Sequence, residues 1–471
     1  MTTNKKRLYR FRPLVILPEA KPPKTVVDEL LARELYLGTL EQNNDPMDGM
    51  QDAYWDGDDI VWGNFIRHYC FCLLNAAYFV SVAGDSIPFG PEQIVARATP
   101  DVLPDAPIKQ IFEDFISAVM ADEKISGLMS LLIEKQRLTQ EELRLLLDIY
   151  NRQFLALLAG TFSQHGHGDF LEGLDQHLPN IELTDFEAVA RLVDNKTLRA
   201  MARSLEQASH QMRLLGLCEH ASGLRQQPVA KKNLLRLTGD FPTLYLNECV
   251  KAIYDEYYIA CFTEQKDDPS IWGHYASGHS GIGLIFEFEE HEGLLKMQMK
   301  DKTHLQLHQV IYGSEPPMVN FFESLGYLTK TALHKHWLSS GERVSPLASQ
   351  YNSSDFRSAY WQTYVATVSH KFSEWARERE YRAVRSAWFY GRKPNSERVM
   401  QYEEKHLKGV IFGMRTPIEM QVQIMSALDD TLSEAQKAEF EFYSARYCPV
   451  KKKLEINRLD LLKFEGPNHH H

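Results

Sequence analysis

Apolar residues recur with two different spacings along the chain, and the spacing changes twice. Residues 1–89 and 246–465 contain short apolar runs of strand length separated by turn residues. Residues 90–245 instead carry Leu and Ile three and four positions apart, the spacing of amphipathic helices. The pattern predicts a strand-rich region interrupted by a large all-helical insertion. Residues 466–471 end in three histidines, and we interpret them as a tail and tag remnant.

The stretch 257–288 contains the clearest run of elements. It begins with an apolar segment short enough for a buried strand. Asp268 followed by Pro269 is typical of the cap and first position of a helix. Trp272, Tyr275 and His279 share one face of that helix, and glycines end it before a second apolar strand. These rings either pack in the core or belong to a binding site.

Two other predicted strands carry charged side chains. Apolar and charged residues alternate over residues 8–12 and again over 378–384. Since successive side chains of a strand point to opposite faces, each strand places its charged groups side by side. These groups are Arg10 and Arg12 on the first strand, and Glu378, Glu380 and Arg382 on the second. They form either a binding site or a structural ladder of ion pairs.

The composition narrows the classes of function. The chain has 471 residues, with 52 Lys and Arg against 63 Asp and Glu, for a net charge of −11. This balance disfavours nonspecific coating of nucleic acid, which depends on neutralising phosphates. Without a signal peptide or an apolar run of membrane-spanning length, and with cysteines in apolar runs, we expect a cytoplasmic protein that contacts no membrane. Oligomer formation stays open.

Residues 191–239 have a different charge balance, with nine Lys or Arg against three acids. The segment is either a solvated helix face or a contact surface for nucleic acid or an acidic protein. Phosphate-loop and dinucleotide-binding motifs are absent from the sequence. His165 and His167 lie in a glycine-containing loop with no visible fourth ligand, so we expect no metal site there.

Six short motifs occur in an order that resembles a known family. They are YRFRP at 9–13, NDPMDG at 44–49, CFTE at 261–264, WGHY at 272–275 with Gly281, EREYR at 378–382 and KGVIFG at 408–413. This ordered set resembles the bacterial family catalogued as domain of unknown function twenty-nine seventy-one. The resemblance covers about residues 1–85 and 250–430, so the helical block is an addition of this protein. The family name implies no activity.

The charged strands also resemble the arrangement of ADP-ribosyltransferases, in which an arginine, a hydroxyl-bearing strand and a Glu-x-Glu surround NAD. This resemblance implies an α+β fold with a mixed or antiparallel sheet core. It implies that Arg12 or Arg10 holds the phosphates, that Glu380 is the catalytic acid and that Glu378 prepares the acceptor. The other residues expected to bind NAD are Tyr36, Thr39, Asn44, Asp45, Trp272, His274, Tyr275 and Arg382.

Three functions follow from these observations. The first is an NAD-dependent ADP-ribosyltransferase-like effector or NAD glycohydrolase, acting as a toxin or in phage defence and modifying nucleic acid or protein. The alternative is a noncatalytic sensor or interaction module that binds a partner through the basic helices at 191–239. The third is a metal-dependent nuclease whose carboxylates are Asp45, Asp48, Glu378 and Glu380.

Overall fold

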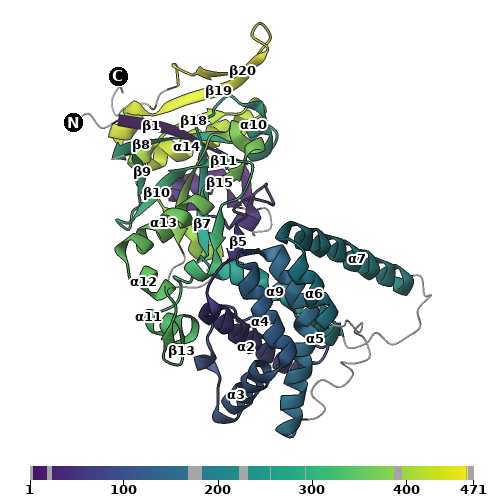
Figure 1. Cartoon of the computed structure of the whole chain (residues 1–471). Coiled ribbons are helices and arrows are strands. Elements are labelled where there is room, and N and C mark those ends of the chain that lie inside the picture. The colour runs from purple at the N-terminus through teal and green to yellow at the C-terminus, as the bar shows by residue number, and fades with distance from the viewer. Residues whose placement is uncertain are drawn as a thin grey trace, which may run out of the picture. The chain divides into compact units, whose positions relative to one another are not determined.

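The computed structural model describes residues 4–17, 24–167, 183–221, 232–254, 256–291, 293–386, 395–462 and 464. The chain forms two compact units (Figure 1). The sheet unit comprises Met1–Met50, Asp255–Pro317 and Tyr364–His471, and the helical unit comprises Gln51–Tyr254 and Met318–Thr363.

These boundaries differ from the predicted ones, which placed residues 51–89, 246–254 and 318–363 with the strand-rich core. The difference centres on the helix α2 (Asp59–Ala83), which packs with helices α3, α4 and α8 of the helical unit. Its buried residues lie all around the helix. A helix that is apolar on every side belongs in the middle of a helical core.

The sheet unit is built on nine strands in the order β1-β7-β16-β10-β9-β8-β18-β19-β20. Their pairings are antiparallel except between β18 and β19, which run parallel. The α+β class with a mixed, largely antiparallel sheet is therefore confirmed. The strand bounds are β1 (Asn4–Arg12), β7 (Tyr257–Thr263), β8 (Ile282–His291), β9 (Leu294–Gln298), β10 (His304–Gln309), β16 (Glu380–Ser386), β18 (Leu407–Phe412), β19 (Glu441–Cys448) and β20 (Lys453–Arg458).

The first strand closes part of this sheet into a ring. β1 pairs with β8 along all nine of its residues, and Tyr9 also pairs with Thr263 at the end of β7. Strands β1, β7, β16, β10, β9 and β8 therefore follow one another around a closed circuit. β8 changes partner along its length: Ile282–Phe286 pairs with β18, and Glu289–His291 pairs with β9.

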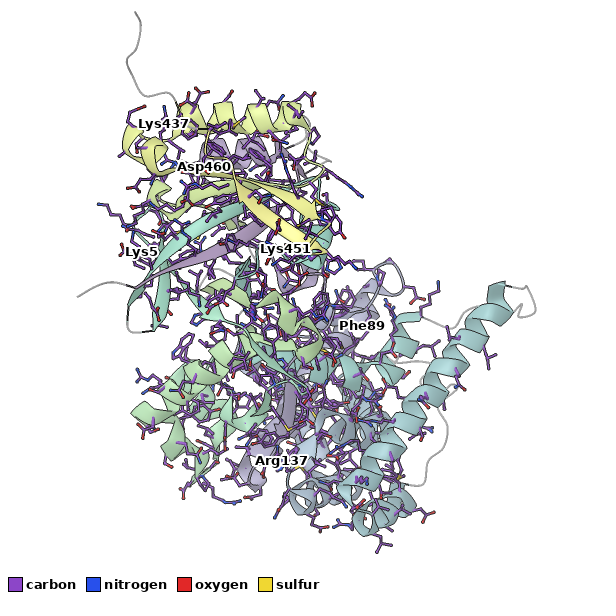
Figure 2. The ribbon with its side chains drawn as sticks, turned by 90° about the horizontal axis from the view of Figure 1, so that it is seen from above. Lys5, Phe89, Arg137, Lys437, Lys451 and Asp460 are labelled. Atoms are coloured by element: carbon purple, nitrogen blue, oxygen red, sulfur yellow. The ribbon has the colours of Figure 1, made fainter. Side chains whose placement is uncertain are left out.

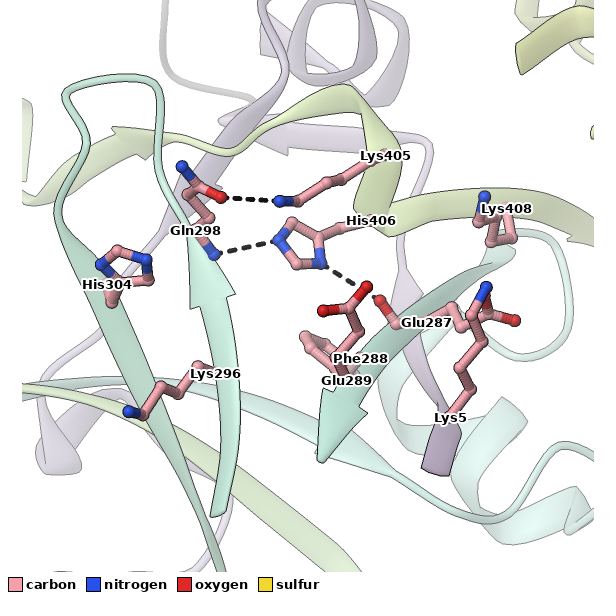
Figure 3. A pocket seen from close by; sticks show the side chains of 10 residues that line it. All are labelled: Lys5, Glu287, Phe288, Glu289, Lys296, Gln298, His304, Lys405, His406 and Lys408. Atoms are coloured by element: carbon pink, nitrogen blue, oxygen red, sulfur yellow. Dashed lines mark hydrogen bonds and ion pairs between the residues drawn. The ribbon is translucent and has the colours of Figure 1, made fainter. Parts of the chain in front are cut away.

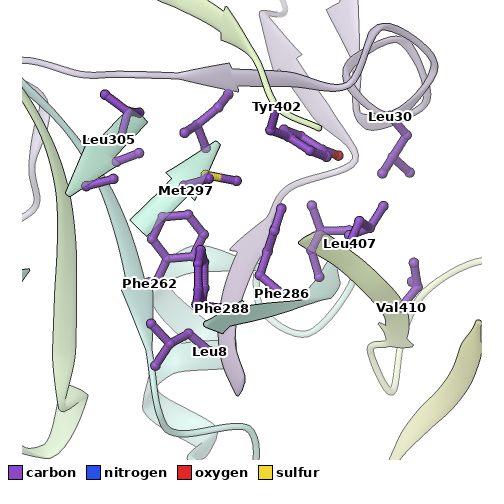
Figure 4. Close-up of a cluster of buried hydrophobic side chains, with 14 of the residues drawn as sticks. Leu8, Leu30, Phe262, Phe286, Phe288, Met297, Leu305, Tyr402, Leu407 and Val410 are labelled. Carbon is purple, nitrogen blue, oxygen red and sulfur yellow. The ribbon is translucent and has the colours of Figure 1, made fainter. Parts of the chain in front are cut away.

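The two faces of these strands contact different apolar clusters. Leu8, Phe262, Phe286 and Tyr381 belong to the larger cluster (Figure 4), where the helices α1 (Val26–Ala32) and α14 (Ile418–Thr431) also contribute side chains. The smaller cluster, on the opposite face, contains Phe11 and Trp272. The ring of Trp272 meets that of Phe11 edge-on at 4.7 Å.

The predicted helix start at Asp268 is confirmed. The Asp268 side chain accepts the backbone N–H of Ser270, and Pro269 opens the helix α10 (Pro269–Tyr275). The helix ends before His279, which the spacing had placed on the same face. The imidazole of His279 nevertheless stacks on Trp272 at 6.1 Å, because the chain turns back over the ring.

The apolar run at residues 34–40 forms only a short strand. The strand β4 (Glu34–Tyr36) pairs with β17 (Val399–Gln401), and a single bridge then joins Gly38 to Ile259 of β7. A 3-10 turn, η1 (Leu40–Gln42), follows. Short pairs also join β2 (Val15–Leu17) to β3 (Lys24–Thr25) and β11 (Ile311–Gly313) to β15 (His370–Phe372). The helix α15 (Glu434–Glu439) precedes β19.

The helical unit contains most of the helices. They are α2, α3 (Ala106–Ala121), α4 (Glu123–Lys135), α5 (Gln140–Gln164), α6 (Leu183–Leu192), α7 (Asn195–Ala221), α8 (Lys232–Gly239), α9 (Phe241–Ala252), α11 (Lys330–Leu333) and α12 (Leu347–Tyr351), with α13 (Ser354–Val368) running into the sheet unit. Strands β5 (Asp52–Trp55), β6 (Leu138–Thr139) and β12 (Met318–Asn320) form a small sheet, and β13 (Ser339–Ser340) pairs with β14 (Arg343–Val344). Arg137 is labelled in Figure 2, and its guanidinium lies over the ring of Tyr54, 3.8 Å from the ring centroid.

The helix α2 has the length and apolar composition of a membrane span. However, 67% of its most apolar window is buried inside the protein. This burial is typical of a core helix in a folded unit, and the other described helices do not meet the criteria for a span.

Candidate functional site

Five charged side chains form one buried network in the sheet unit. Lys371 Nζ lies 2.7 Å from Glu378 Oε2 and 3.2 Å from Glu380 Oε2. Arg382 Nε donates to Glu380 Oε1 at 2.9 Å, and its Nη2 lies 2.8 Å from Asp48 Oδ2. Arg382 is fully buried, and its Nη1 donates to the carbonyl of Val368. The network alternates cations and carboxylates, so each buried charge faces an opposite one.

The strand β16 provides only part of the Glu-x-Glu motif. Glu380 is its first residue, whereas Glu378 ends the 3-10 helix η7 (Ser373–Glu378). Between them Arg379 adopts a left-handed conformation with φ of 43°. Thr263 Oγ1 donates to the Glu378 carbonyl, which ties the end of η7 to the end of β7. The two carboxylates therefore meet at Lys371, although they are not on one continuous strand as predicted.

Lys371 reaches the carboxylates because of a small parallel pairing. It lies on β15, where its register partner on β11 is Tyr312. The hydroxyl of Tyr312 accepts the backbone N–H of Glu380 at 2.9 Å. Pairing of β11 with β15 thus places both the lysine and the tyrosine beside the first residue of β16.

Asp48 comes from the turn at residues 43–49. The two hydrogen bonds between Gly38 and Ile259 hold the chain before this turn against β7. Asn43 Nδ2 then donates to Asp48 Oδ2 at 2.8 Å, and Asp45 Oδ1 accepts the backbone N–H of Met47. Among the described residues, no hydrogen-bond partner reaches the second oxygen of either buried aspartate.

The surroundings shift the pKa values of Glu378 and Glu380 in opposite directions. Burial alone would raise the pKa of Glu380, but Arg382 and Lys371 lower it to about 2. Burial raises the pKa of Glu378, and Lys371 offsets only part of this effect. Burial also raises the pKa of Asp48 against the opposing charge of Arg382. Near neutral pH the site therefore combines a fixed carboxylate with a carboxyl that takes up a proton more readily.

Aromatic side chains surround Glu378. The hydroxyl of Tyr275, at the end of α10, donates to Glu378 Oε1 at 2.7 Å. Lys371 Nζ lies 4.6 Å from the centroid of the Trp375 ring, and exposed His274 lies 6.3 Å from the same ring. Tyr275 and Trp375 are half-buried. Glu378 is thus the acid of the network that adjoins solvent-accessible rings.

The structure does not bring Arg10 and Arg12 to these glutamates. On β1, Arg10 and Arg12 lie on the same face as Leu8, which belongs to the larger apolar cluster. On β16, Tyr381 faces that cluster, so Glu380 lies on the opposite face of the sheet. Arg10 Nη2 donates to the carbonyl of Tyr36. Arg12 forms a bidentate pair with Glu29 of α1, with Nε to Oε1 at 3.0 Å and Nη2 to Oε2 at 2.5 Å. The predicted ladder therefore forms without these arginines.

The remaining predicted residues have separate surroundings. The Tyr36 hydroxyl and the Thr39 backbone both donate to Gln42 Oε1, and Asn44 is exposed. Trp272 is fully buried, and its Nε1 donates to the carbonyl of Lys266. Of the residues predicted to form the NAD site, the structure brings together Tyr275, Glu378, Glu380 and Arg382. Asp48, which was predicted for the nuclease alternative, joins them.

Two further predictions concern metals and the basic segment. Within the described ranges, no group of three or more His, Cys, Asp or Glu is arranged to hold a metal ion, since cations occupy the clustered carboxylates. In residues 191–239, several arginines pair with acids of the same unit. These pairs are Arg191 with Glu134 and Glu187, Arg199 with Glu142, and Arg203 with Glu141. Residues 222–231 lie outside the described part.

Sequence reasoning missed Lys371, Trp375 and Tyr312. Lys371 and Trp375 lie in the polar segment before the EREYR motif, and Tyr312 ends the short apolar run at 308–312. A lysine in a short strand carries no local signal for an ion pair, because the pairing depends on which strands meet. The CFTE motif was the signal in the sequence that pointed to this part of the site, since its Thr263 hydrogen-bonds to the backbone carbonyl of Glu378.

Comparisons with known proteins support one of the two resemblances. Residues 271–383 match the family model described as "Protein of unknown function (DUF2971)". This match confirms the predicted resemblance to that family over residues 271–383, a segment that contains Tyr275, Lys371, Glu378, Glu380 and Arg382. Searches of curated proteins and of solved structures found no match.

Proposed function

We propose that the sheet unit is an ADP-ribosyltransferase-like enzyme that cleaves the bond between nicotinamide and ribose in NAD. The observation that carries the proposal is the pair Glu378 and Glu380, which Lys371 bridges. The pKa of Glu378 is raised, whereas that of Glu380 is lowered. Paired carboxylates with divergent pKa values are a recurring arrangement for breaking glycosidic bonds. Perturbed groups of this kind also concentrate at functional sites.

The two acids would take different roles. When nicotinamide leaves with the electrons of the glycosidic bond, positive charge develops on the ribose, and the ionised Glu380 stabilises it. An acceptor hydroxyl or water then forms the new bond to the ribose carbon and passes its proton to Glu378. Lys371 and Arg382 keep Glu380 ionised throughout. Tyr275 orients the Glu378 carboxylate.

The phosphate anchor must be a different group from the predicted one, because Arg12 is committed to Glu29. Arg377 and Arg379 are exposed on either side of Glu378 and carry the charge that a diphosphate requires. His274 and Trp375 offer ring faces for the nicotinamide. We assign these four residues to NAD binding within the proposal.

A noncatalytic role is the second candidate, and a specific observation favours it. Both carboxylate oxygens of Glu380 contact Arg382 or Lys371, and the side chain is buried. Such saturation is also the property of an ion-pair network that stabilises a fold. In that case the protein would act as a sensor or interaction module, with the helical unit binding the partner.

Nicotinamide release separates the two candidates. Purified protein is incubated with NAD, with and without mixed nucleic acid, beside Glu378→Gln and Glu380→Gln. Glu264→Gln is the matched control, since Glu264 pairs with Lys6 outside the network. Release by the wild type and the control, but not by the two variants with intact circular dichroism, supports the enzyme. No release and no NAD-dependent thermal shift in the wild type would leave the noncatalytic role.

A further inference from the structure

A pocket of about 410 Å³ opens in the sheet unit where β8 changes partner from β18 to β9 (Figure 3). Its size lies in the range of small-molecule sites. The residues that line it are Lys5, Glu287, Phe288, Glu289, Lys296, Gln298, His304, Lys405, His406 and Lys408. None of them belongs to the network around Glu380.

The His406 side chain forms hydrogen bonds with two strands at this pocket, β9 and β8. Its Nε2 accepts the backbone N–H of Gln298 on β9 at 2.9 Å. Its Nδ1 therefore carries the proton and donates to the carbonyl of Glu287 on β8 at 3.1 Å. The ring is buried, and burial lowers the pKa of His406. A neutral imidazole thus satisfies backbone groups that an adjacent strand would otherwise pair, so the opening is built into the fold.

Four lysines converge on the opening from different elements. Lys5 comes from β1, Lys296 from β9, Lys405 from the 3-10 turn η9 (Glu404–His406) and Lys408 from β18. Two glutamates stand against these four amines. The fold thus brings together positive charges from three segments that are distant in sequence.

Carboxylates neutralise part of this positive charge, and Lys408 lies 3.5 Å from Glu439, which does not line the pocket. Glu287 is shared between Lys5 at 3.0 Å and Arg7 at 3.2 Å. Lys405 donates to the uncharged Gln298 Oε1 at 2.6 Å and lies 3.6 Å from Glu403. Lys296 forms no ion pair with any residue that the structure describes. Lys296 and Lys405 are therefore the amines most available to a ligand.

We propose that this pocket binds the phosphate groups of a small phosphorylated molecule. Lysine amines are compact point charges that suit phosphate oxygens. Amines from β9 and η9, which the hydrogen bond from Gln298 to His406 joins, would contact adjacent phosphates. A chain of two or three phosphates matches this arrangement better than a single one, because the positive charges are spread over several elements.

Calorimetric titration tests the assignment. Inorganic tripolyphosphate, ATP and adenosine are titrated separately into the full-length protein at low salt. Binding of tripolyphosphate and ATP, but not adenosine, supports a phosphate site, and a gain for ATP over tripolyphosphate identifies a nucleotide as the source of the phosphates. Because charge drives the contact, raising the salt should weaken binding. Equal binding of adenosine and ATP, or no heat with either phosphate compound, would overturn the proposal.

The double variant Lys296→Gln with Lys405→Gln locates the site. We expect it to weaken tripolyphosphate binding about tenfold or more, in line with the loss of two charge-assisted contacts. Lys300→Gln is the matched control, because Lys300 is exposed near the same hairpin but does not line the pocket. Both lysines of the double variant are exposed, so it should fold. Unchanged affinity in the double variant contradicts the assignment.

Discussion

Asp48 and Arg382 lie 334 positions apart in the chain, yet Asp48 Oδ2 accepts from Arg382 Nη2 at 2.8 Å in a buried ion pair. The turn that follows β4 therefore closes over the face of β16 that carries Glu380 and Arg382. Arg382 in turn fixes Glu380. The site thus depends on the first fifty residues as well as on the segment that matches the family.

The low pKa of Glu380 predicts how stability depends on pH. Its folded pKa of about 2 lies below the ordinary value of 4.5, so Glu380 stabilises the fold above its unfolded pKa. That contribution is lost as the pH falls through the folded pKa. Between pH 6 and pH 2 the stability advantage of the wild type over Glu380→Gln should shrink by about 3 kcal/mol. Urea unfolding at several pH values measures it, and a constant difference would contradict the assignment of charge.

Tyr275→Phe should change the pH profile of nicotinamide release. The Tyr275 hydroxyl lowers the pKa of Glu378, against the dominant effect of burial. Without it the pKa of Glu378 rises further, and a reaction that needs ionised Glu378 shifts its acid limb to higher pH. The cost in stability should be about 1–2 kcal/mol for one hydrogen bond. Tyr443→Phe is the control, because Tyr443 packs against the same apolar cluster but donates to Glu441. An identical shift of the acid limb in both variants would contradict a specific effect of Tyr275 on the pKa of Glu378.

The two arginine-bearing segments should respond differently to substitution. Arg379→Gln is expected to raise the KM for NAD about tenfold with little change in stability, since Arg379 is exposed. Arg12→Gln should instead lower stability by about 3 kcal/mol, because it leaves buried Glu29 without its cation. Steady-state kinetics and urea unfolding measure the two effects. A larger KM effect in Arg12→Gln would restore the original assignment of the NAD anchor.

Gly281 of the WGHY motif region has a packing role that can be measured. A Cβ atom at this position would lie 2.2 Å from the backbone oxygen of Arg12. Gly281→Ala should therefore destabilise the protein by about 1–3 kcal/mol or more, because the backbone of β1 must move. Gly273→Ala is the control: nothing lies within 4 Å of its Cβ position in α10, and we expect a gain of about 0.5–1 kcal/mol. Thermal denaturation of both variants checks the difference.

Local patterns were sufficient for several parts of the site. Alternation placed Glu380 and Arg382 on one face of a strand, and the Asp268–Pro269 pair located the helix that carries Tyr275. The ordered motifs also predicted the resemblance to the family whose model matches residues 271–383, because motif order is a property of the sequence itself. These features depend on residues within a few positions of one another.

The tertiary structure alone decided which charges meet. Alternation showed that Leu8, Arg10 and Arg12 share a face, but only the tertiary structure showed that this face meets the larger apolar cluster and is opposite to the face of Glu380. Likewise, Lys371 joins the two glutamates because β11 pairs with β15. Strand periodicity fixes the relative direction of neighbouring side chains, whereas the face that is buried and the partner that it meets depend on contacts between distant segments.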